Sequence, residues 1–148
     1  MRLALFQPDI PQNAGTLIRL CACLGVGIDI IEPCGFPLTD KGFRRAGMDY
    51  LDKARVTCHV SWGAFREKSA GRLVLVTPDG ETPYADFTYR AGDVLLLGPE
   101  STGFPPAIRS SVPDRVKIPM REGLRSINIA LAGAMVLGEA LRQTKAFP

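Results

Sequence analysis

Three polar segments, far apart in the chain, hold most of the side chains that could do chemistry. The first is "PDIPQNAGTLIR", residues 8–19, in which Asn13 and Arg19 flank the start of a predicted helix. A structural interpretation has Asn13 capping that helix and Arg19 in solvent. However, Arg19 lies between two apolar residues of an apolar helix, where a cation needs a partner or a cleft. We therefore favour a functional role for Arg19.

The second segment is "LLLGPESTGFP", residues 95–105, in which a buried-looking strand ends at a glycine. In open α/β sheets, ligands bind beyond the carboxyl ends of the strands. Gly98 would let a ligand approach the backbone closely, and Glu100 offers a hydrogen-bond acceptor. Taken alone, this segment is equally compatible with an ordinary loop.

The third segment is "IPMREGLRSINIALA", residues 118–132, which leads from a strand into the last helix. Arg121 and Arg125 lie in the intervening loop, and Ser126 and Asn128 open the helix. Ser126 is a candidate helix cap. Its hydroxyl and the free backbone amides beside it could also meet a ligand.

These segments are positioned by short apolar runs that alternate with helical stretches. The runs predict strands at 2–6, 28–32, 54–60, 72–77, 93–98 and 115–119, and the helical stretches predict helices at 14–25, 40–51, 61–69, 105–112 and 126–143. The strands do not alternate polar and apolar residues, as expected when helices cover both faces of a sheet. The pattern predicts an α/β fold with a mostly parallel sheet. Residues 77–93 form the longest loop-like stretch, with room for a turn or a minor strand.

Composition limits the classes of protein. The 148 residues suit one domain, 1–148, and a net charge of +3 permits a nucleic-acid partner without requiring one. Cys21 and Cys23 have a poor spacing for zinc and lie in an apolar run, so we predict core residues and no metal site. No apolar run reaches the roughly 20 residues that span a bilayer. A cytoplasmic protein with no membrane partner and no signal peptide is therefore expected.

Common nucleotide-binding and hydrolase motifs do not occur in this sequence. The turn after the first predicted strand lacks the G-x-G-x-x-G pattern of dinucleotide-binding folds, and the chain contains no P-loop. His59 is the single histidine and lies near a predicted strand end. We assign His59 a structural or surface position rather than a role in a hydrolase triad.

Together and in this order, the three segments resemble the motifs of the SPOUT superfamily of RNA methyltransferases, in its ribose 2′-O-methylating branch. The length and layout, including "IIEPCGFPLTDKGFRRAGMDYLD", are most similar to the minimal members that act on the wobble nucleotide of tRNA. The likeness covers essentially the whole chain. It implies a C-terminal deep trefoil knot and an obligate homodimer. The last helix, apolar on nearly every side, would then pack against both the knot and the partner subunit.

The same resemblance implies that S-adenosylmethionine is the methyl donor and S-adenosylhomocysteine the product. The residues that would line the cofactor pocket are Val76, Gly98, Ile118, Met120 and Ser126. Glu100 and Asn128 resemble residues that order the pocket and the substrate, and Asn13 would support the first motif loop. Arg19 resembles the arginine beside the reacting 2′-hydroxyl. Because its pKa exceeds about 12, we expect Arg19 to orient the hydroxyl or a phosphate rather than to act as the base.

Binding of tRNA requires cations that contact phosphate groups. The candidates are Lys41, Arg44, Arg45, Arg121 and Arg125, although the first three would equally suit a solvated helix face.

The resemblance implies 2′-O-methylation of the wobble ribose, on cytidine or a modified uridine. Three alternatives remain: methylation of another tRNA or ribosomal RNA ribose, a non-catalytic RNA-binding dimer, and a Rossmann-type nucleotide-binding oxidoreductase.

Overall fold

The computed structural model describes residues 1–38, 50 and 53–148, and within them seven strands form one sheet. The strand order is β3-β2-β1-β6-β4-β7-β5, and each of these pairings is parallel. The elements, in chain order, are β1 (Arg2–Phe6), α1 (Pro11–Cys23), β2 (Gly27–Ile31), β3 (Val56–His59), α3 (Trp62–Lys68), β4 (Leu73–Val76), β5 (Thr82–Pro83), β6 (Val94–Leu97), α4 (Pro106–Ser111), β7 (Arg115–Lys117) and α5 (Ile129–Thr144). The predicted α/β fold with a parallel sheet is confirmed.

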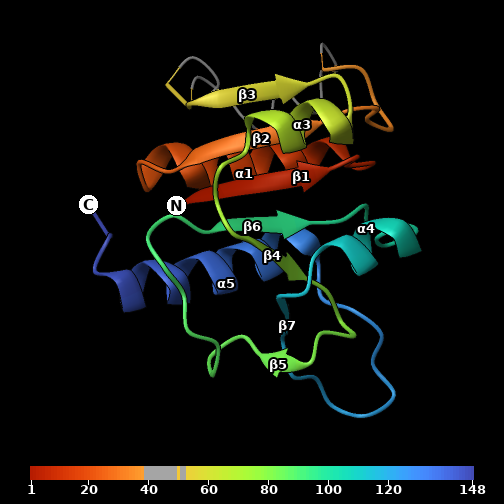
Figure 1. Ribbon diagram of the computed structural model, residues 1–148, viewed down its shortest axis with the longest axis vertical. Helices are drawn as coiled ribbons and strands as arrows, with labels where there is room; N and C mark the ends of the chain where they lie inside the picture. Colours follow the sequence, from red (N-terminus) through yellow and green to blue (C-terminus); the bar gives the residue numbers. More distant parts are fainter. Residues whose placement is uncertain (39–49, 51–52) are drawn as a thin grey trace.

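Helices cover both faces of the sheet (Figure 1). Helices α1 and α5 pack on one face against alternate strand residues such as Leu5, Leu95 and Leu97. Helices α3 and α4 pack on the other face, against the strand residues that alternate with the first set, such as Ala4 and Leu96. All residues of β2 and β6 are buried, which explains why these runs lack a polar alternation.

Helix α5 lies unusually close to the sheet and to α1. A Cβ atom on Gly133 would come within 2.7 Å of the Leu17 side chain and 2.9 Å of the Leu97 side chain, so a larger residue would require these two leucines to move. The side chains of Leu131 and Met135 remain 60% and 38% exposed on the same helix. The apolar character predicted for this helix therefore includes an outward-facing part.

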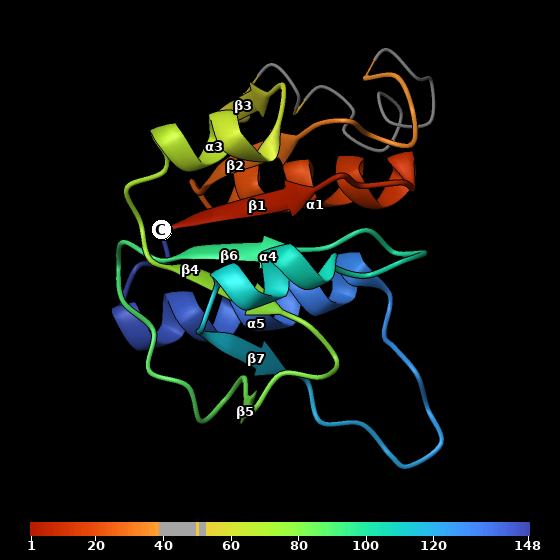
Figure 2. The same ribbon diagram turned by 45° about the vertical axis from the view of Figure 1, so that its right-hand side comes forward.

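The sheet brings the three polar segments to one edge. Strands β1 and β6 pair in register, and β6 in turn pairs with β4. The carboxyl ends of parallel strands lie at the same edge of a sheet. The loops that follow β1, β4, β6 and β7 therefore meet there, and the loop between β7 and α5 extends away from the body of the protein (Figure 2).

Several local predictions can be compared with the structure. The minor strand expected within residues 77–93 is β5, whereas the helix predicted at 40–51 falls mostly outside the described residues. Cys21 is buried as predicted, but the prediction for Cys23 is wrong because its side chain is exposed. Two residues along an α-helix is a rotation of about 200°, so neighbouring cysteines cannot share a face. His59 is buried and structural, with Nε2 2.8 Å from the Asp29 carboxylate.

Candidate active site

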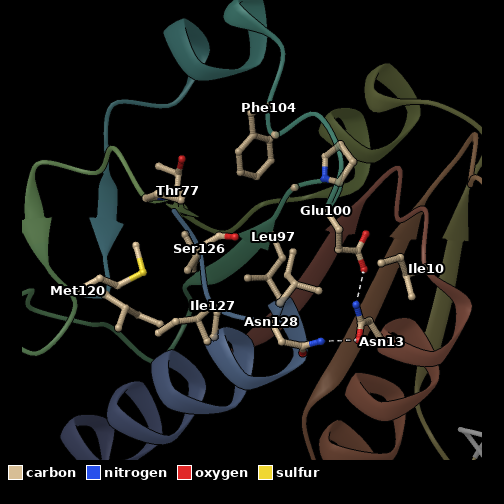
Figure 3. A pocket seen from close by; sticks show the side chains of 18 residues that line it. Ile10, Asn13, Thr77, Leu97, Glu100, Phe104, Met120, Ser126, Ile127 and Asn128 are labelled. Carbon is tan, nitrogen blue, oxygen red and sulfur yellow. Dashed lines mark hydrogen bonds between the residues drawn. The ribbon is translucent and has the colours of Figure 1, made fainter. Parts of the chain in front are cut away.

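A pocket of about 350 Å³ lies at the carboxyl edge of the sheet (Figure 3). Its walls come from the ends of β4 and β6, the loops after β1, β6 and β7, and the first turn of α5. The five residues predicted for cofactor binding all line it: Val76, Gly98, Ile118, Met120 and Ser126. Asn13, Glu100 and Asn128 line it as well. Seven of these eight residues come from the three polar segments, and Val76 comes from the end of β4, so four distant parts of the chain surround one space.

A chain of hydrogen bonds joins the three segments (Figure 3). Asn128 precedes α5, and its Oδ1 accepts from the backbone amides of Ala130 and Leu131 at 2.9 and 3.3 Å. Asn128 Nδ2 donates to Asn13 Oδ1 at 3.0 Å, and Asn13 Nδ2 donates to Glu100 Oε1 at 2.9 Å. Because the helix amides fix the orientation of Asn128, they also fix the direction of every later bond in the chain.

Both helix-cap predictions are wrong. Helix α5 begins at Ile129 with Asn128 as its cap, so Ser126 lies before the helix and faces the pocket instead. Helix α1 begins at Pro11, a residue well suited to a first helical position because it has no amide to satisfy. Asn13 therefore lies inside the first turn, and its side chain is available to bond Asn128 and Glu100.

Asp9 contributes to this site, although no local sequence pattern indicates it. The backbone amides of Glu100 and Ser101 donate to its carboxylate at 3.0 and 3.1 Å, and the Ser101 hydroxyl also donates to it. In return, the Asp9 amide donates to Glu100 Oε2 at 3.1 Å. The partner lies 91 residues away, so only the fold could reveal the pair.

The two carboxyl groups have opposite electrostatic behaviour. A hydrogen bond with the Glu100 side chain, helped by bonds from the Ser101 hydroxyl and both backbone amides, lowers the pKa of Asp9 to about 2. Burial, followed by the neighbouring Asp9, raises the pKa of Glu100. Two adjacent carboxyl groups shift apart in this way because the group that keeps its proton donates a hydrogen bond to the group that is ionised.

Packing inside the protein also explains why residue 98 is a glycine, in addition to the predicted close approach of a ligand. A Cβ atom at this position would come within 3.1 Å of the Phe104 ring, which forms another wall of the pocket. Phe104 and Thr77 also line the pocket, although neither belongs to the predicted site residues. Their apolar or ordinary polar character gives no signal until the loops are folded together.

The predicted arginines lie elsewhere. Arg19 is on the exposed side of α1, with its guanidinium carbon 5.1 Å from the centre of the Tyr50 ring. Of the described residues that line the pocket, none is Arg19, Arg121 or Arg125. Arg121 and Arg125 are exposed on the loop that continues from the pocket. Lys41, Arg44 and Arg45 fall outside the described residues.

Within residues 1–38, 50 and 53–148, no group of three or more histidine, cysteine, aspartate or glutamate side chains could hold a metal ion. Over the same part of the chain, no helix combines the length and apolar character needed to cross a bilayer.

Comparison with known proteins identifies relatives over nearly the full length. The SpoU rRNA Methylase family matches residues 1–138. A tRNA (cytidine(34)-2′-O)-methyltransferase of Beijerinckia indica is 58% identical, covering 97% of this chain and 92% of the relative. The protein of the same name from Escherichia coli K12 is 40% identical, covering 97% and 93%.

Solved structures give the same result. A structure determined to explain 2-OH methylation of C/U34 on tRNA superposes with a TM-score of 0.91 at 39% identity, covering 96% of this chain and 94% of the other. The SpoU methyltransferase AviRb of Streptomyces viridochromogenes, in complex with the cofactor AdoMet, has a TM-score of 0.83 at 27% identity, covering 97% and 57%. These relatives leave the oxidoreductase alternative without support. The family that the three motifs predicted is thus confirmed, and the chain belongs to the SpoU methylase family.

Proposed function

We propose that this protein transfers a methyl group from S-adenosylmethionine to the ribose 2′-oxygen of the wobble nucleotide, cytidine or modified uridine 34, of tRNA. The observation that carries the proposal is the convergence of all three motif segments on one pocket. The relatives named for this reaction, at 58% and 40% identity over nearly the whole chain, support the choice of substrate.

The pocket suits S-adenosylmethionine in size and chemistry. Its volume of about 350 Å³ falls in the range of small-molecule sites. Apolar side chains such as Leu97 and Ile118 would surround the adenine, and the backbone around Gly98 and Met120 would provide hydrogen bonds. The cofactor, when bound, supplies a methyl group on a positively charged sulfur. AdoMet in the AviRb complex is consistent with this assignment.

The polar residues would position the reactants. Glu100, Asn13 and Asn128 form a connected chain at one side of the pocket, where they would hold the loops in a single arrangement. Arg19 is exposed and does not line this pocket; it would contact the RNA, orienting the reacting hydroxyl or a neighbouring phosphate. The proton of the 2′-hydroxyl would pass to a phosphate oxygen or to solvent.

Exposed side chains support both a homodimer and a contact with RNA. The exposed Leu131 and Met135 on α5 suit a homodimer interface, since apolar side chains on a helix favour burial. Arg121 and Arg125 are exposed beside Met120 and Ser126, where cations would meet the phosphates of tRNA. Lys41, Arg44 and Arg45 would extend this contact.

Further parts of the proposal rest on the family relationship. The C-terminal part, from β7 through α5, would form the deep trefoil knot. The chain 1–148 would act as one domain in the cytoplasm, where tRNA is available.

Incubation with labelled cofactor tests the proposed function. The purified protein is mixed with tritiated S-adenosylmethionine and total tRNA from a strain that lacks its gene, and the labelled nucleotide is mapped by nuclease digestion and mass spectrometry. Label on the ribose of nucleotide 34 is expected. Label on another tRNA ribose, or only on ribosomal RNA in a parallel incubation, would show that the proposed substrate is wrong. Absence of cofactor binding would overturn the reaction itself.

An arginine variant tests the role given to Arg19. Arg19→Ala should bind S-adenosylhomocysteine as wild type does but lose most of its methyl transfer to tRNA. Full turnover with intact cofactor binding would contradict this role.

A further inference from the structure

We infer that Asp9 is a positioning residue for the methyl-transfer site, acting through Glu100 to hold the pocket loops in register. We call the reciprocal hydrogen bonds between Asp9 and residues 100–101 the Asp9–Glu100 clasp. The inference rests on the proposed function, because it concerns the same pocket.

The clasp joins two loops in both directions. The Asp9 carboxylate accepts from the amides of Glu100 and Ser101, and the Glu100 carboxylate accepts from the amide of Asp9, all between 3.0 and 3.1 Å. Each loop thus provides both a carboxylate and an amide donor. A reciprocal arrangement fixes the separation and the relative orientation of the loops, whereas a single bond would leave them free to rotate.

Both ends of the clasp are adjacent to the pocket wall. Ile10 follows Asp9 directly, Gly98 precedes Glu100 by two residues, and all of Ile10, Gly98 and Glu100 line the pocket. Asp9 itself is not among the described residues that line it. It therefore acts on the site through the residues it holds.

Glu100 transmits the position of Asp9 to the rest of the site. One oxygen of its carboxylate accepts from the Asp9 amide, and the other accepts from Asn13, which in turn accepts from Asn128. Any rotation of the Glu100 side chain that follows loss of the clasp would withdraw the acceptor from Asn13. Asn13 would then be free to move, and so would its hydrogen bond with Asn128 at the start of α5.

The loop after β2 also packs closely against Asp9. The amide of Gly35 donates to the carbonyl of Pro8 at 2.9 Å. A Cβ atom on Gly35 would come within 2.8 Å of both the Cα and the Cβ of Asp9. Asp9 is thus held between two loops, so its carboxylate has little freedom to find other partners.

A carboxylate suits this position because both of its oxygens accept hydrogen bonds. Two amides and one hydroxyl donate to its two oxygens. Asparagine has nearly the same shape but would direct an amide NH₂ group at one or more of these donors. Asp9→Asn therefore weakens the clasp by removing one acceptor oxygen, with minimal change in volume.

Binding of S-adenosylhomocysteine, measured by titration calorimetry, tests the inference in two backgrounds. In the otherwise wild-type protein, Asp9→Asn should raise the Kd about tenfold and lower the single-turnover rate of methyl transfer at saturating cofactor by a similar factor. In a Glu100→Ala background, the same change should have a clearly smaller effect, because the route through the Glu100 side chain is already absent and only the backbone amides of residues 100 and 101 still bond to Asp9. Asp86→Asn, which removes an exposed carboxylate on the loop after β5, is the matched control and should stay within twofold of wild type.

The outcomes distinguish the inference from the proposed function. A Kd for Asp9→Asn within twofold of wild type, or a full tenfold effect in the Glu100→Ala background, would overturn the inference alone. A wild-type protein that fails to bind S-adenosylhomocysteine would instead overturn the proposed function.

Hydrogen exchange of the wild-type protein gives a second test that does not depend on folding of a variant. The amides of Glu100 and Ser101 should exchange at least tenfold more slowly than unstructured backbone, because both donate to Asp9. Exchange at the rate of unstructured backbone would contradict the clasp.

Discussion

Two clusters of charged side chains in this protein hold carboxylates by different means. On β2, Asp29 is only 4% exposed, and Arg2 pairs with it through Nε at 2.6 Å and Nη2 at 3.0 Å. His59 Nε2 lies 2.8 Å from the same carboxylate. At the carboxyl edge of the sheet, Asp9 and Glu100 are only partly buried, and backbone amides hold them.

The difference shows which cluster serves stability and which serves the site. The Asp29 cluster lies within paired strands, where a buried carboxylate is stabilised by a cation and by hydrogen bonds from neighbouring strands. The Asp9–Glu100 clasp spans two loops and places two carboxyl groups together, a cost that a purely structural contact would avoid. We therefore expect changes in the first cluster to affect folding, and changes in the second to affect binding.

The largest effect is expected from Asp29→Ala. Loss of this carboxylate leaves Arg2 and the buried His59 without their partner, which should lower the free energy of unfolding by about 3–5 kcal/mol. Urea denaturation measures this change. Turnover per folded molecule should match wild type, and a specific loss of turnover in the folded fraction would contradict the division between the clusters.

Glu100→Gln should have the next largest effect, and on binding. Both oxygens of Glu100 accept hydrogen bonds, so a glutamine must direct its NH₂ group at the Asp9 amide or at Asn13. We expect the Kd for S-adenosylhomocysteine to rise about tenfold, which corresponds to about 1.4 kcal/mol. Calorimetry checks the value, and an unchanged Kd would show that Glu100 has no part in ordering the pocket.

Two substitutions at Asn128 separate its two roles. Asn128→Ala removes the cap of α5 and should lower the free energy of unfolding by about 1 kcal/mol, together with a loss of methyl transfer. Asn128→Asp keeps a cap oxygen but loses the donor to Asn13. It should retain stability in denaturation experiments and still lose transfer. Equal transfer by Asn128→Asp and wild type would show that the link to Asn13 is dispensable.

The smallest effect is the dependence of the clasp on pH. The pKa of Asp9 is about 2 in the folded protein, compared with about 3.9 for an unperturbed aspartate. A lowered carboxyl pKa stabilises the fold above the unfolded value, and this contribution is lost as the pH falls through the folded value. The raised pKa of Glu100 acts in the opposite direction.

Comparison of wild type with Asp9→Asn measures this contribution. The difference in their free energies of unfolding should be constant above about pH 5 and should decrease between pH 4 and pH 2. A difference that does not change over this range would show that the Asp9 charge is not held by the clasp. Asp86→Asn controls for the loss of one exposed carboxylate.

The sequence predicted the fold well for a physical reason. Strands such as β2 and β6 are buried on both faces, so their apolar runs are continuous and easily recognised. Parallel pairing then places the ends of these strands at a common edge. This is why the segments around Asn13, Glu100 and Asn128 could be expected to meet.

The remaining features depend on contacts that no local pattern contains. Asp9 looks like a turn residue between two prolines until its partners, 91 and 92 residues away, are brought beside it. Arg19 lies six residues beyond Asn13, about 9 Å further along α1 and on a different side of the helix. Ser126 has the residue type of a helix cap, but the helix begins three residues later because Asn128 takes that role.

A crystal structure of the protein with S-adenosylhomocysteine would test the central claim most directly. We predict that the ligand occupies the pocket lined by Gly98, Ile118 and Met120, with Asp9 and Glu100 still joined by their reciprocal hydrogen bonds. A ligand bound elsewhere, or a complex in which the two loops have separated, would contradict the account.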